Sequence, residues 1–224
     1  MVIRFRNEPM AEVKGVLFDM DGLVLDTEKL YTRFWMEAAQ ALGYPMTLEQ
    51  ALGLRSLGFV PGQAHLERCF GPGVDYHAIR NERIRRMDAH IAAHGVDLKP
   101  GILELLDELD RRNIPRAITS SSSHDLIREY LSRHDLDHRF NALCSGKDVP
   151  NGKPAPDIYL LGASVLGLKP EECLALEDSP AGILSAHRAG CRPVMIPDQD
   201  LPDEKTTALL YAQCDGLVDV INLL

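Results

Sequence analysis

The sequence predicts an α/β fold in which an all-helical domain is inserted into a doubly wound parallel sheet. From residue 100 onward, helical patterns alternate with short apolar runs, as expected for parallel strands joined by crossover helices. Between residues 27 and 96 the pattern is helical throughout, without strand-like alternation. We therefore expect a Rossmann-like α/β core made of residues 1–26 and 97–224, and a separate helical domain over residues 27–96.

The first strand of the core is predicted over residues 13–18, which form a short and mostly apolar run. This strand leads into Asp19-Met20-Asp21-Gly22, where an extended chain would point both aspartates to one side and Met20 to the core. Two like charges in one crevice repel, so such a pair is suited to a bound cation. Asp and Gly are also common turn residues, and an acidic turn is the alternative interpretation.

The inserted domain is predicted to contain two long amphipathic helices. The first is expected to end at Gly43 and the second near Gly95, because glycine commonly terminates helices. Glycines and prolines between the two helices break the chain into short pieces. The apolar positions are Leu30, Phe34, Ala38 and Leu42 in the first helix, and Tyr76, Ile79, Met87 and Ile91 in the second.

After the insertion, the core is predicted to continue as helix and strand in alternation. Ser179 is suited to cap a helix that has Pro180 at its first position and ends at Gly190. The tail of the chain is expected to cover the last edge of the sheet. Helices are predicted around the apolar stripes at residues 102–109, 126–131 and 158–165, and strands over residues 114–118, 140–144, 173–176 and 192–196.

Polar residues with chemical potential follow these strands. Ser120 and Ser121 come directly after the second core strand, and Glu177 and Asp178 come after a later one. Lys153 lies in the loop Gly-Lys-Pro-Ala-Pro-Asp before a predicted helix. The carboxyl ends of parallel strands line one crevice, so these groups are expected to converge near Asp19 and Asp21.

This order of carboxylates, hydroxyls, lysine and carboxylates resembles the four motifs of the haloacid dehalogenase (HAD) superfamily. The resemblance runs from residue 13 to residue 197. The helical insertion and the Asp178-Ser179-x-x-Gly182 arrangement are similar to the branch that holds β-phosphoglucomutase and small-molecule phosphatases, in which the insertion is a helical cap. The resemblance implies a phosphoric monoester hydrolase that acts on a small phosphorylated metabolite, either a sugar phosphate or a nucleotide-type monoester.

The resemblance also implies roles for individual residues. Asp19 would be the nucleophile that forms an aspartyl-phosphate, and Asp21 the general acid and base. Lys153 would offset the negative charge of Asp19 and of the transferring phosphoryl group. Ser120, and with it Ser121, would bind phosphate oxygens; the alternative is that this run of serines is a loop with a helix cap.

A magnesium ion is the cofactor that the resemblance implies. Mg²⁺ prefers hard oxygen ligands and keeps several waters. The expected ligands are the side chains of Asp19 and Asp178 and the backbone carbonyl of Asp21, with Glu177 hydrogen-bonded to waters of the metal. An ordinary helix cap is the alternative interpretation of the Glu177-Asp178-Ser179 segment.

Two other functions compete with a phosphatase. The first is a phosphosugar mutase of the β-phosphoglucomutase type, which shares similar motifs around Lys153 and Asp178. Where those mutases carry a histidine twelve positions after the nucleophile, this chain has Tyr31. The segment that begins at Asp26 instead looks like phosphatases acting on pseudouridine monophosphate or hexose 6-phosphates. The second competitor is a non-catalytic phosphate-binding module, which the intact motifs disfavour.

The segment Gly53-Leu54-Arg55-Ser56 of the insertion resembles the loop by which caps of this branch reach the core site. Arg55 would then contact the part of the substrate remote from phosphorus, and Tyr31 would help to line the pocket. A solvated surface arginine is the alternative for Arg55.

Composition restricts the partners and the compartment. The net charge of 24 − 33 = −9 disfavours a broad nucleic-acid surface, and no apolar run approaches the length of a membrane span. The N-terminus does not resemble a secretory signal. Five scattered cysteines without a C-x-x-C pair fit a reducing compartment. We expect a cytoplasmic monomer or weak dimer that binds neither nucleic acid nor membrane.

Overall fold

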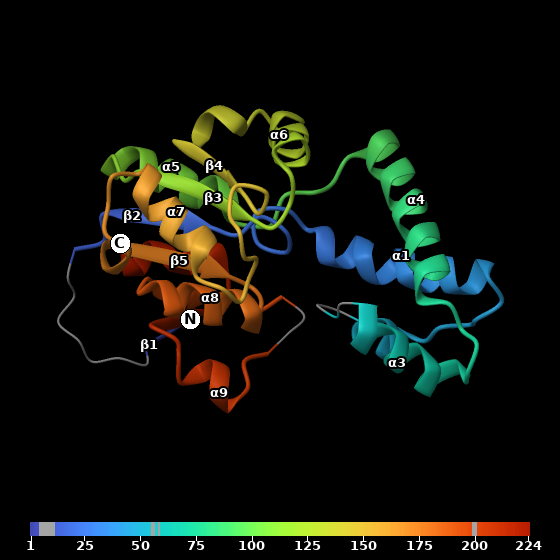
Figure 1. Ribbon diagram of the computed structural model, residues 1–224. Helices are drawn as coiled ribbons and strands as arrows, with labels where there is room; N and C mark the ends of the chain where they lie inside the picture. Colours follow the sequence, from blue (N-terminus) through green and yellow to red (C-terminus); the bar gives the residue numbers. More distant parts are fainter. Residues whose placement is uncertain (5–11, 55–56, 58, 199–200) are drawn as a thin grey trace. The chain divides into compact units, whose positions relative to one another are not determined.

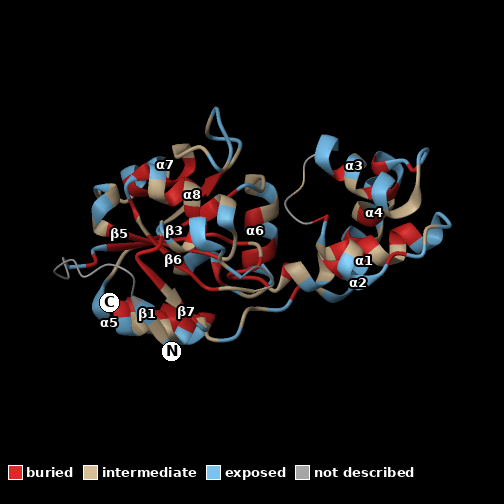
Figure 2. Cartoon of the chain, turned by 90° about the horizontal axis from the view of Figure 1, so that it is seen from below, coloured by how far each residue is buried: buried red, intermediate tan, exposed pale blue. Residues whose placement is uncertain are grey.

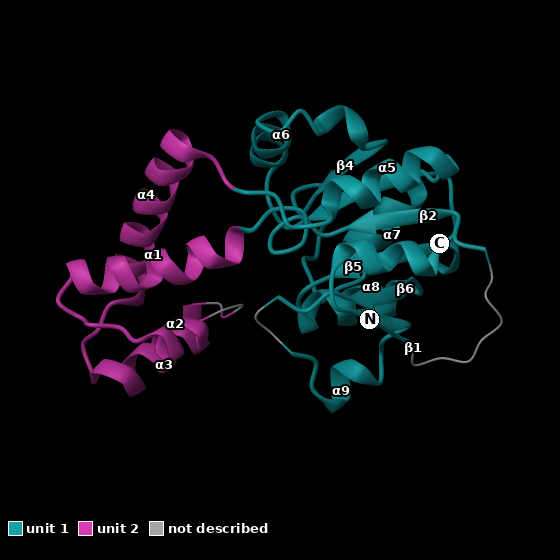
Figure 3. Cartoon of the chain, turned by 180° about the vertical axis from the view of Figure 1, so that it is seen from behind, with its two compact units in different colours: residues 1–26, 97–224 teal, residues 27–96 magenta. Residues whose placement is uncertain are grey.

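The structure is a computed structural model that describes residues 1–4, 12–54, 57, 59–198 and 201–224. The chain divides into two compact units, one formed by Met1–Asp26 with Asp97–Leu224 and the other by Thr27–Val96 (Figure 3). The chain passes from the first unit to the second and back once. A backbone hydrogen bond from Asp26 N to Asp97 O, 2.8 Å long, holds the two crossing segments together.

The first unit is built on a seven-stranded sheet in the order β1-β7-β6-β5-β2-β3-β4 (Figure 1). All neighbouring strands are parallel except β1, which runs antiparallel to β7 at the edge. The predicted α/β fold is therefore confirmed, with an antiparallel edge strand in addition. The strands are β1 Val2–Arg4, β2 Gly15–Phe18, β3 Arg116–Ser120, β4 Ala142–Ser145, β5 Cys173–Glu177, β6 Arg192–Met195 and β7 Ala212–Cys214.

Helices cover both faces of this sheet, as in a doubly wound fold. Figure 2 shows α7 and α8 over one face and α5 over the other. The tail contributes strand β7 and the 3₁₀ segment Leu217–Leu223, so it extends the sheet as well as covering it. The helices are α5 Ile102–Arg112, α6 His124–Ser132, α7 Asp157–Val165, α8 Pro180–Ala189 and α9 Glu204–Thr207.

The sheet interior is apolar and tightly packed. Every residue of β2 and β5 is buried, which explains why these strands are short continuous apolar runs rather than alternating ones. Helix α7 lies close to β2 and β3 because Gly162 has no side chain: a Cβ there would stand 2.6 Å from Thr119 Cγ2. This close approach brings the inner face of α7 next to the strand ends.

The described residues of the second unit contain helices and loops but no strand, and the unit has its own core. Helices α1 Thr27–Ala41 and α4 Tyr76–His94 pack together, with α2 Leu48–Leu52 and α3 Phe59–Phe70 beside them. Trp35, Leu66 and Ile79 are among the buried side chains of this core. Leu42, expected on the apolar stripe of the first helix, is exposed instead, because α1 ends at Ala41. No helix in the described parts of the chain is long and apolar enough to span a membrane.

Candidate active site

The site forms where three neighbouring strands end. Strand β2 lies between β3 and β5, and Phe18 is paired in register with Ile118 on one side and Leu176 on the other. The ladder continues for one more residue, because Asp19 N donates a 3.0 Å hydrogen bond to Leu176 O. The strand-end side chains of β2, β3 and β5 therefore share one edge of the sheet.

Asp19, Lys153 and Glu177 form a buried ion-pair network at this edge. The Lys153 ammonium donates to Asp19 Oδ1 at 2.5 Å and to Glu177 Oε1 at 2.6 Å. Glu177 is fully buried and Asp19 is 8 % exposed. Charged groups at such depth are costly unless they are paired. At this edge of the sheet, one ammonium group is therefore in direct contact with each of two carboxylates.

Burial and the crowding of carboxylates shift the proton affinities of the groups at this edge. Burial, with the nearby charges of Glu177 and Asp21, raises the pKa of Asp19 to about 8, although Lys153 acts in the opposite direction. Burial also works against the charged form of Lys153, but the carboxylates of Asp19 and Glu177 outweigh it and hold the lysine pKa well above its ordinary value. Lys153 is therefore an ammonium, and a further cation nearby would favour the charged form of Asp19.

The donor set at this edge fits a magnesium ion. One carboxylate oxygen each of Asp19, Glu177 and Asp178 lies within 4.8 Å of the others. Only hard oxygen donors are present in this group, which is the chemistry that Mg²⁺ prefers. The Glu177 carboxylate is already engaged by Lys153 and by the Ser179 hydroxyl, which donates to Oε2 at 3.1 Å. Both Glu177 oxygens therefore accept hydrogen bonds, and direct ligation by Asp19 and Asp178 stays a prediction.

Asp21 is held by the loop that follows β3. The Ser122 hydroxyl donates to Asp21 Oδ2 at 3.1 Å. Gly22, with φ of 80°, lets the chain turn sharply after Asp21, and its N–H bonds back to Leu25 O at 2.9 Å. The serine loop after β3 therefore orients the Asp21 carboxylate, and the turn after β2 sets the backbone that carries it.

The serines of the loop after β3 differ in their surroundings. Ser120 is buried, and its hydroxyl accepts the Ser122 N–H at 3.1 Å, so it organises its own loop. Ser121 is exposed. Ser122, which the sequence reasoning passed over, is the serine in contact with a predicted catalytic carboxylate. Four successive serines gave no local signal to separate them, and phosphate binding by Ser120 and Ser121 stays a prediction.

The Glu177 carboxylate lies directly against the first turn of helix α8. Ser179 caps this helix by accepting the Gly182 N–H at 3.2 Å, and Pro180 is its first residue, as predicted. A Cβ on Gly182 would lie 1.9 Å from the Glu177 carboxyl carbon. Glycine at this position therefore lets the helix approach the carboxylate directly. The hydroxyl of Tyr159, another residue that the sequence reasoning missed, donates to Glu177 Oε1.

The predicted residues of the helical unit are only partly described. Arg55 lies outside the described residues. Tyr31 is in α1, and the Arg83 guanidinium of α4 lies 4.8 Å from its ring centroid. Arg83 is 8 % exposed, burial lowers its pKa, and its Nε has no hydrogen-bond partner among the described residues. A second guanidinium contact reaches the Trp35 ring at 5.3 Å.

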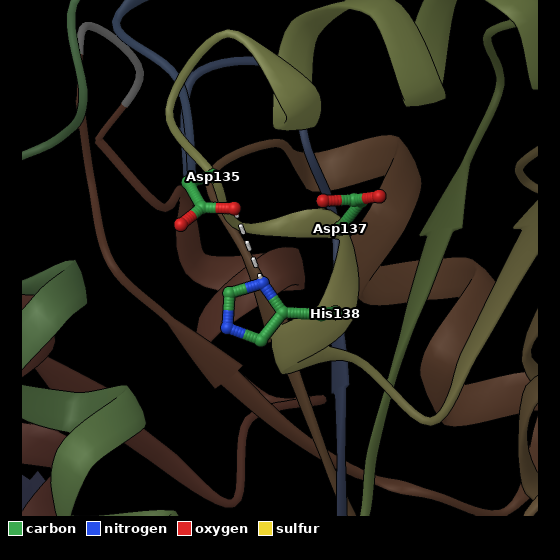
Figure 4. A group of neighbouring side chains, drawn as sticks. All are labelled: Asp135, Asp137 and His138. Atoms are coloured by element: carbon green, nitrogen blue, oxygen red, sulfur yellow. Dashed lines mark ion pairs between the residues drawn. The ribbon is translucent and has the colours of Figure 1, made fainter.

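A second group of potential metal ligands lies on the surface of the first unit (Figure 4). Asp135, Asp137 and His138 are all exposed, and His138 Nδ1 lies 3.5 Å from Asp135 Oδ1. Ion pairs three residues apart are common on protein surfaces and contribute little. All three side chains are exposed to solvent, so the group has the character of an ordinary surface ion pair.

Comparison with known proteins identifies the family. Residues 16–196 match the haloacid dehalogenase-like hydrolase family. The chain belongs to this family. The HAD-like hydrolase predicted from the motif order is therefore confirmed, and the match spans the whole of the helical unit as well as most of the sheet.

Relatives of this HAD-like hydrolase include named phosphatases. A probable pseudouridine-5′-phosphatase from Drosophila melanogaster is 35% identical over 210 residues, covering 90% of this chain and 89% of the relative. Hexitol phosphatase A from Escherichia coli K12 is 34% identical, covering 82% of each chain. Among solved structures, a HAD family hydrolase from Deinococcus radiodurans R1 with bound phosphate and sodium is similar with a TM-score of 0.80, at 25% identity, covering 96% of this chain and 98% of that one.

Proposed function

We propose that the protein is a Mg²⁺-dependent phosphoric monoester hydrolase that works through an aspartyl-phosphate intermediate. Its substrate would be a small phosphorylated metabolite, either a sugar phosphate or a nucleotide-type monoester. The observation that carries the proposal is the buried Asp19–Lys153–Glu177 network, with Asp178 beside it, at the carboxyl end of three parallel strands. Family membership and relatives named as phosphatases support it.

Asp19 and Asp21 would divide the reaction into two steps. In the first, an Asp19 oxygen bonds to phosphorus while the bond from phosphorus to the ester oxygen breaks, and Asp21 gives that oxygen a proton. In the second, Asp21 takes a proton from water, the water oxygen bonds to phosphorus, and Asp19 is released. The hydrogen bond from Ser122 to Asp21 supports this assignment, because it orients the carboxylate without supplying a charge.

Charge balance determines the other roles. Lys153 already donates to Asp19, so it can stabilise negative charge first on the nucleophile and then on the transferring phosphoryl oxygens. Asp19, Asp178 and the Asp21 backbone carbonyl would hold the magnesium ion, with Glu177 orienting its waters. When bound, Mg²⁺ would neutralise the repulsion between Asp19 and the substrate phosphate. Ser120 and Ser121 would bind the phosphate oxygens through the hydroxyl and backbone groups of their loop.

Substrate choice is proposed to depend on the helical unit. Arg55 and Tyr31 would contact the part of the substrate remote from phosphorus. The Tyr31 ring is held by Arg83, so its position is defined within that unit. A tyrosine in place of the mutase histidine favours hydrolysis over phosphosugar isomerisation. We also propose that the protein acts in the cytoplasm as a monomer or weak dimer, without nucleic acid or membrane; its five cysteines are all free.

A substrate screen with Mg²⁺ tests the proposal. The panel contains pseudouridine 5′-phosphate, hexose 6-phosphates, hexitol phosphates, nucleotides and β-glucose 1-phosphate, and both phosphate release and product identity are measured. Phosphate release by the wild type, absent in Asp19→Asn, is the expected result. Conversion of β-glucose 1-phosphate to glucose 6-phosphate without net phosphate release would show a mutase. Phosphate binding without any turnover would show a non-catalytic module.

A further inference from the structure

Tyr159 is a fully buried tyrosine whose hydroxyl reaches into the charged network. It lies in helix α7 with no exposed surface. Its hydroxyl donates to Glu177 Oε1 at 2.5 Å. Burial first, and the charge of Glu177 next, raise the pKa of this hydroxyl well above its ordinary value, so it keeps its proton and acts as a donor. The reaction steps described above make no use of it.

The same oxygen of Glu177 also accepts a hydrogen bond from Lys153. The Lys153 ammonium is 2.6 Å from Glu177 Oε1, and it lies 5.1 Å from the centroid of the Tyr159 ring. Tyr159 therefore contacts both members of this ion pair, Glu177 through its hydroxyl and Lys153 through its ring. The second short contact of Lys153, to Asp19, is the one that the proposed reaction needs.

We propose that Tyr159 is a positioning residue that determines how the Lys153 ammonium is shared between Asp19 and Glu177. The inference rests on the proposed function, because it assigns a role to Lys153 in phosphoryl transfer. Each carboxylate oxygen can accept about two hydrogen bonds, and the phenol occupies one of them at Glu177 Oε1. It does so without adding charge. Without the phenol, Glu177 Oε1 would depend on Lys153 alone and would draw the ammonium away from Asp19 and the phosphoryl oxygens.

The surroundings of Tyr159 hold it in place. Its ring belongs to the apolar cluster formed by the sheet and α7, together with Leu17, Ala117 and Ala163. Gly162, one turn further along the helix, lets α7 approach the sheet closely enough for this contact. The hydroxyl is therefore aimed by the rigid packing of a helix on a sheet, and not by a loop.

Tyr159→Phe tests this role, because it removes one oxygen and keeps the ring in the core. A hydrogen bond to a charged group is worth enough to change a rate by about 10- to 100-fold, and we expect kcat for a phosphomonoester to fall by that factor. Inorganic phosphate, titrated by calorimetry, should bind several-fold more weakly because Lys153 is withdrawn. Tyr211→Phe is the matched control: Tyr211 is a buried tyrosine of the same unit whose ring lies against Arg192, and it should match the wild type in both measurements.

A double-mutant cycle separates positioning from a general structural effect. If Tyr159 acts through Lys153, Tyr159→Phe should cause no further loss of phosphate affinity in a Lys153→Met background. The melting temperature of each variant is measured, and kcat is expressed per mole of folded protein. A lower melting temperature with unchanged kcat and phosphate affinity would overturn the inference, and so would equal losses in the presence and absence of Lys153.

The same measurements distinguish failure of this inference from failure of the proposed function. A wild type that hydrolyses phosphomonoesters while Tyr159→Phe equals Tyr211→Phe would refute the role of Tyr159 alone. A wild type that neither hydrolyses any phosphomonoester of the panel nor binds inorganic phosphate would refute the proposed function, and the inference with it.

Discussion

The two units bury polar side chains in contrasting ways. At the strand ends of the first unit, two carboxylates and an ammonium are in direct contact, and the buried Glu177 carboxylate has Lys153, Tyr159 and Ser179 as donors. In the helical unit, the buried guanidinium of Arg83 lies against aromatic rings and donates to the sulfur of Met87 at 3.6 Å.

This difference bears on the roles that we propose for the two units. Buried ion pairs are costly and are weak evidence of stability, so the network in the first unit indicates chemistry that needs charge at that point. The geometry of this network follows from the register of neighbouring strands, which does not depend on the substrate. The polar groups of the helical unit are not part of the sheet. Substitutions there would therefore leave the strand register intact.

The largest expected effect is that of Asp19→Asn in the first unit. Activity should fall by at least ~10³-fold, because the variant loses the nucleophile and a metal-ligand charge. The fold should remain, since the amide keeps the shape of the side chain and removes one charge from a crowded site. Initial rates on the best substrate of the panel and the melting temperature are the measurements. Substantial residual turnover would exclude the covalent mechanism.

Removal of divalent cations should have the next largest effect. The carboxylates grouped around Asp19 and a phosphate dianion repel one another unless a cation lies between them, so we expect rates to fall by at least ~10²-fold in excess chelator after dialysis. Mg²⁺ should restore activity, and Mn²⁺ should substitute because it also favours oxygen ligands. Full activity in the chelator would count against the proposed metal site.

Gly182→Ala tests whether the placement of Glu177 matters to the network. The added Cβ would lie 1.9 Å from the Glu177 carboxyl carbon, so either the carboxylate or helix α8 must move. We expect a loss of about 10- to 100-fold in kcat and a destabilisation of about 1–3 kcal/mol from overpacking. Gly216→Ala is the control, because nothing lies within 4 Å of a Cβ there. Equal behaviour of the two variants would show that the position of Glu177 is unimportant.

Much of the first unit could be predicted from the sequence because backbone periodicity controls it. Parallel strands bring their carboxyl ends to one edge, so the closeness of Asp19 and Glu177 followed from the strand assignments alone. Other features depend on distant contacts that leave no local signal. Strand β1, only three residues long, is recognisable through its pairing with β7 near the other end of the chain.

The direction of individual side chains is the other feature that the sequence pattern does not predict. Tyr159 occupies a core position of α7, and its hydroxyl joins the charged network only because Glu177, distant in sequence, lies within hydrogen-bond distance. In the sequence, Ser122 cannot be distinguished from the serines beside it. Only the conformation of the loop directs its hydroxyl toward Asp21. In the helical unit, Arg83 is one of several charged residues of a long helix, and the sequence does not separate it from the others. Its burial depends on the packing of α1 against α4.

The smallest expected effect is that of Tyr31→Phe, which asks whether the helical unit contributes to specificity at all. The variant keeps the ring against which the Arg83 guanidinium lies but removes the hydroxyl that interacts with it, so the melting temperature is measured and rates are expressed per mole of folded protein. If the hydroxyl contacts the remote part of the substrate, kcat/KM for the preferred metabolite should fall by about threefold to tenfold, the value of one neutral hydrogen bond. Hydrolysis of p-nitrophenyl phosphate, which lacks such a remote part, should change by less than about twofold. Binding energy from a distant contact would then appear in the rate for one substrate and not for the other. Equal losses on both substrates, or none on either, would place specificity elsewhere in the helical unit and leave Tyr31 with a packing role only.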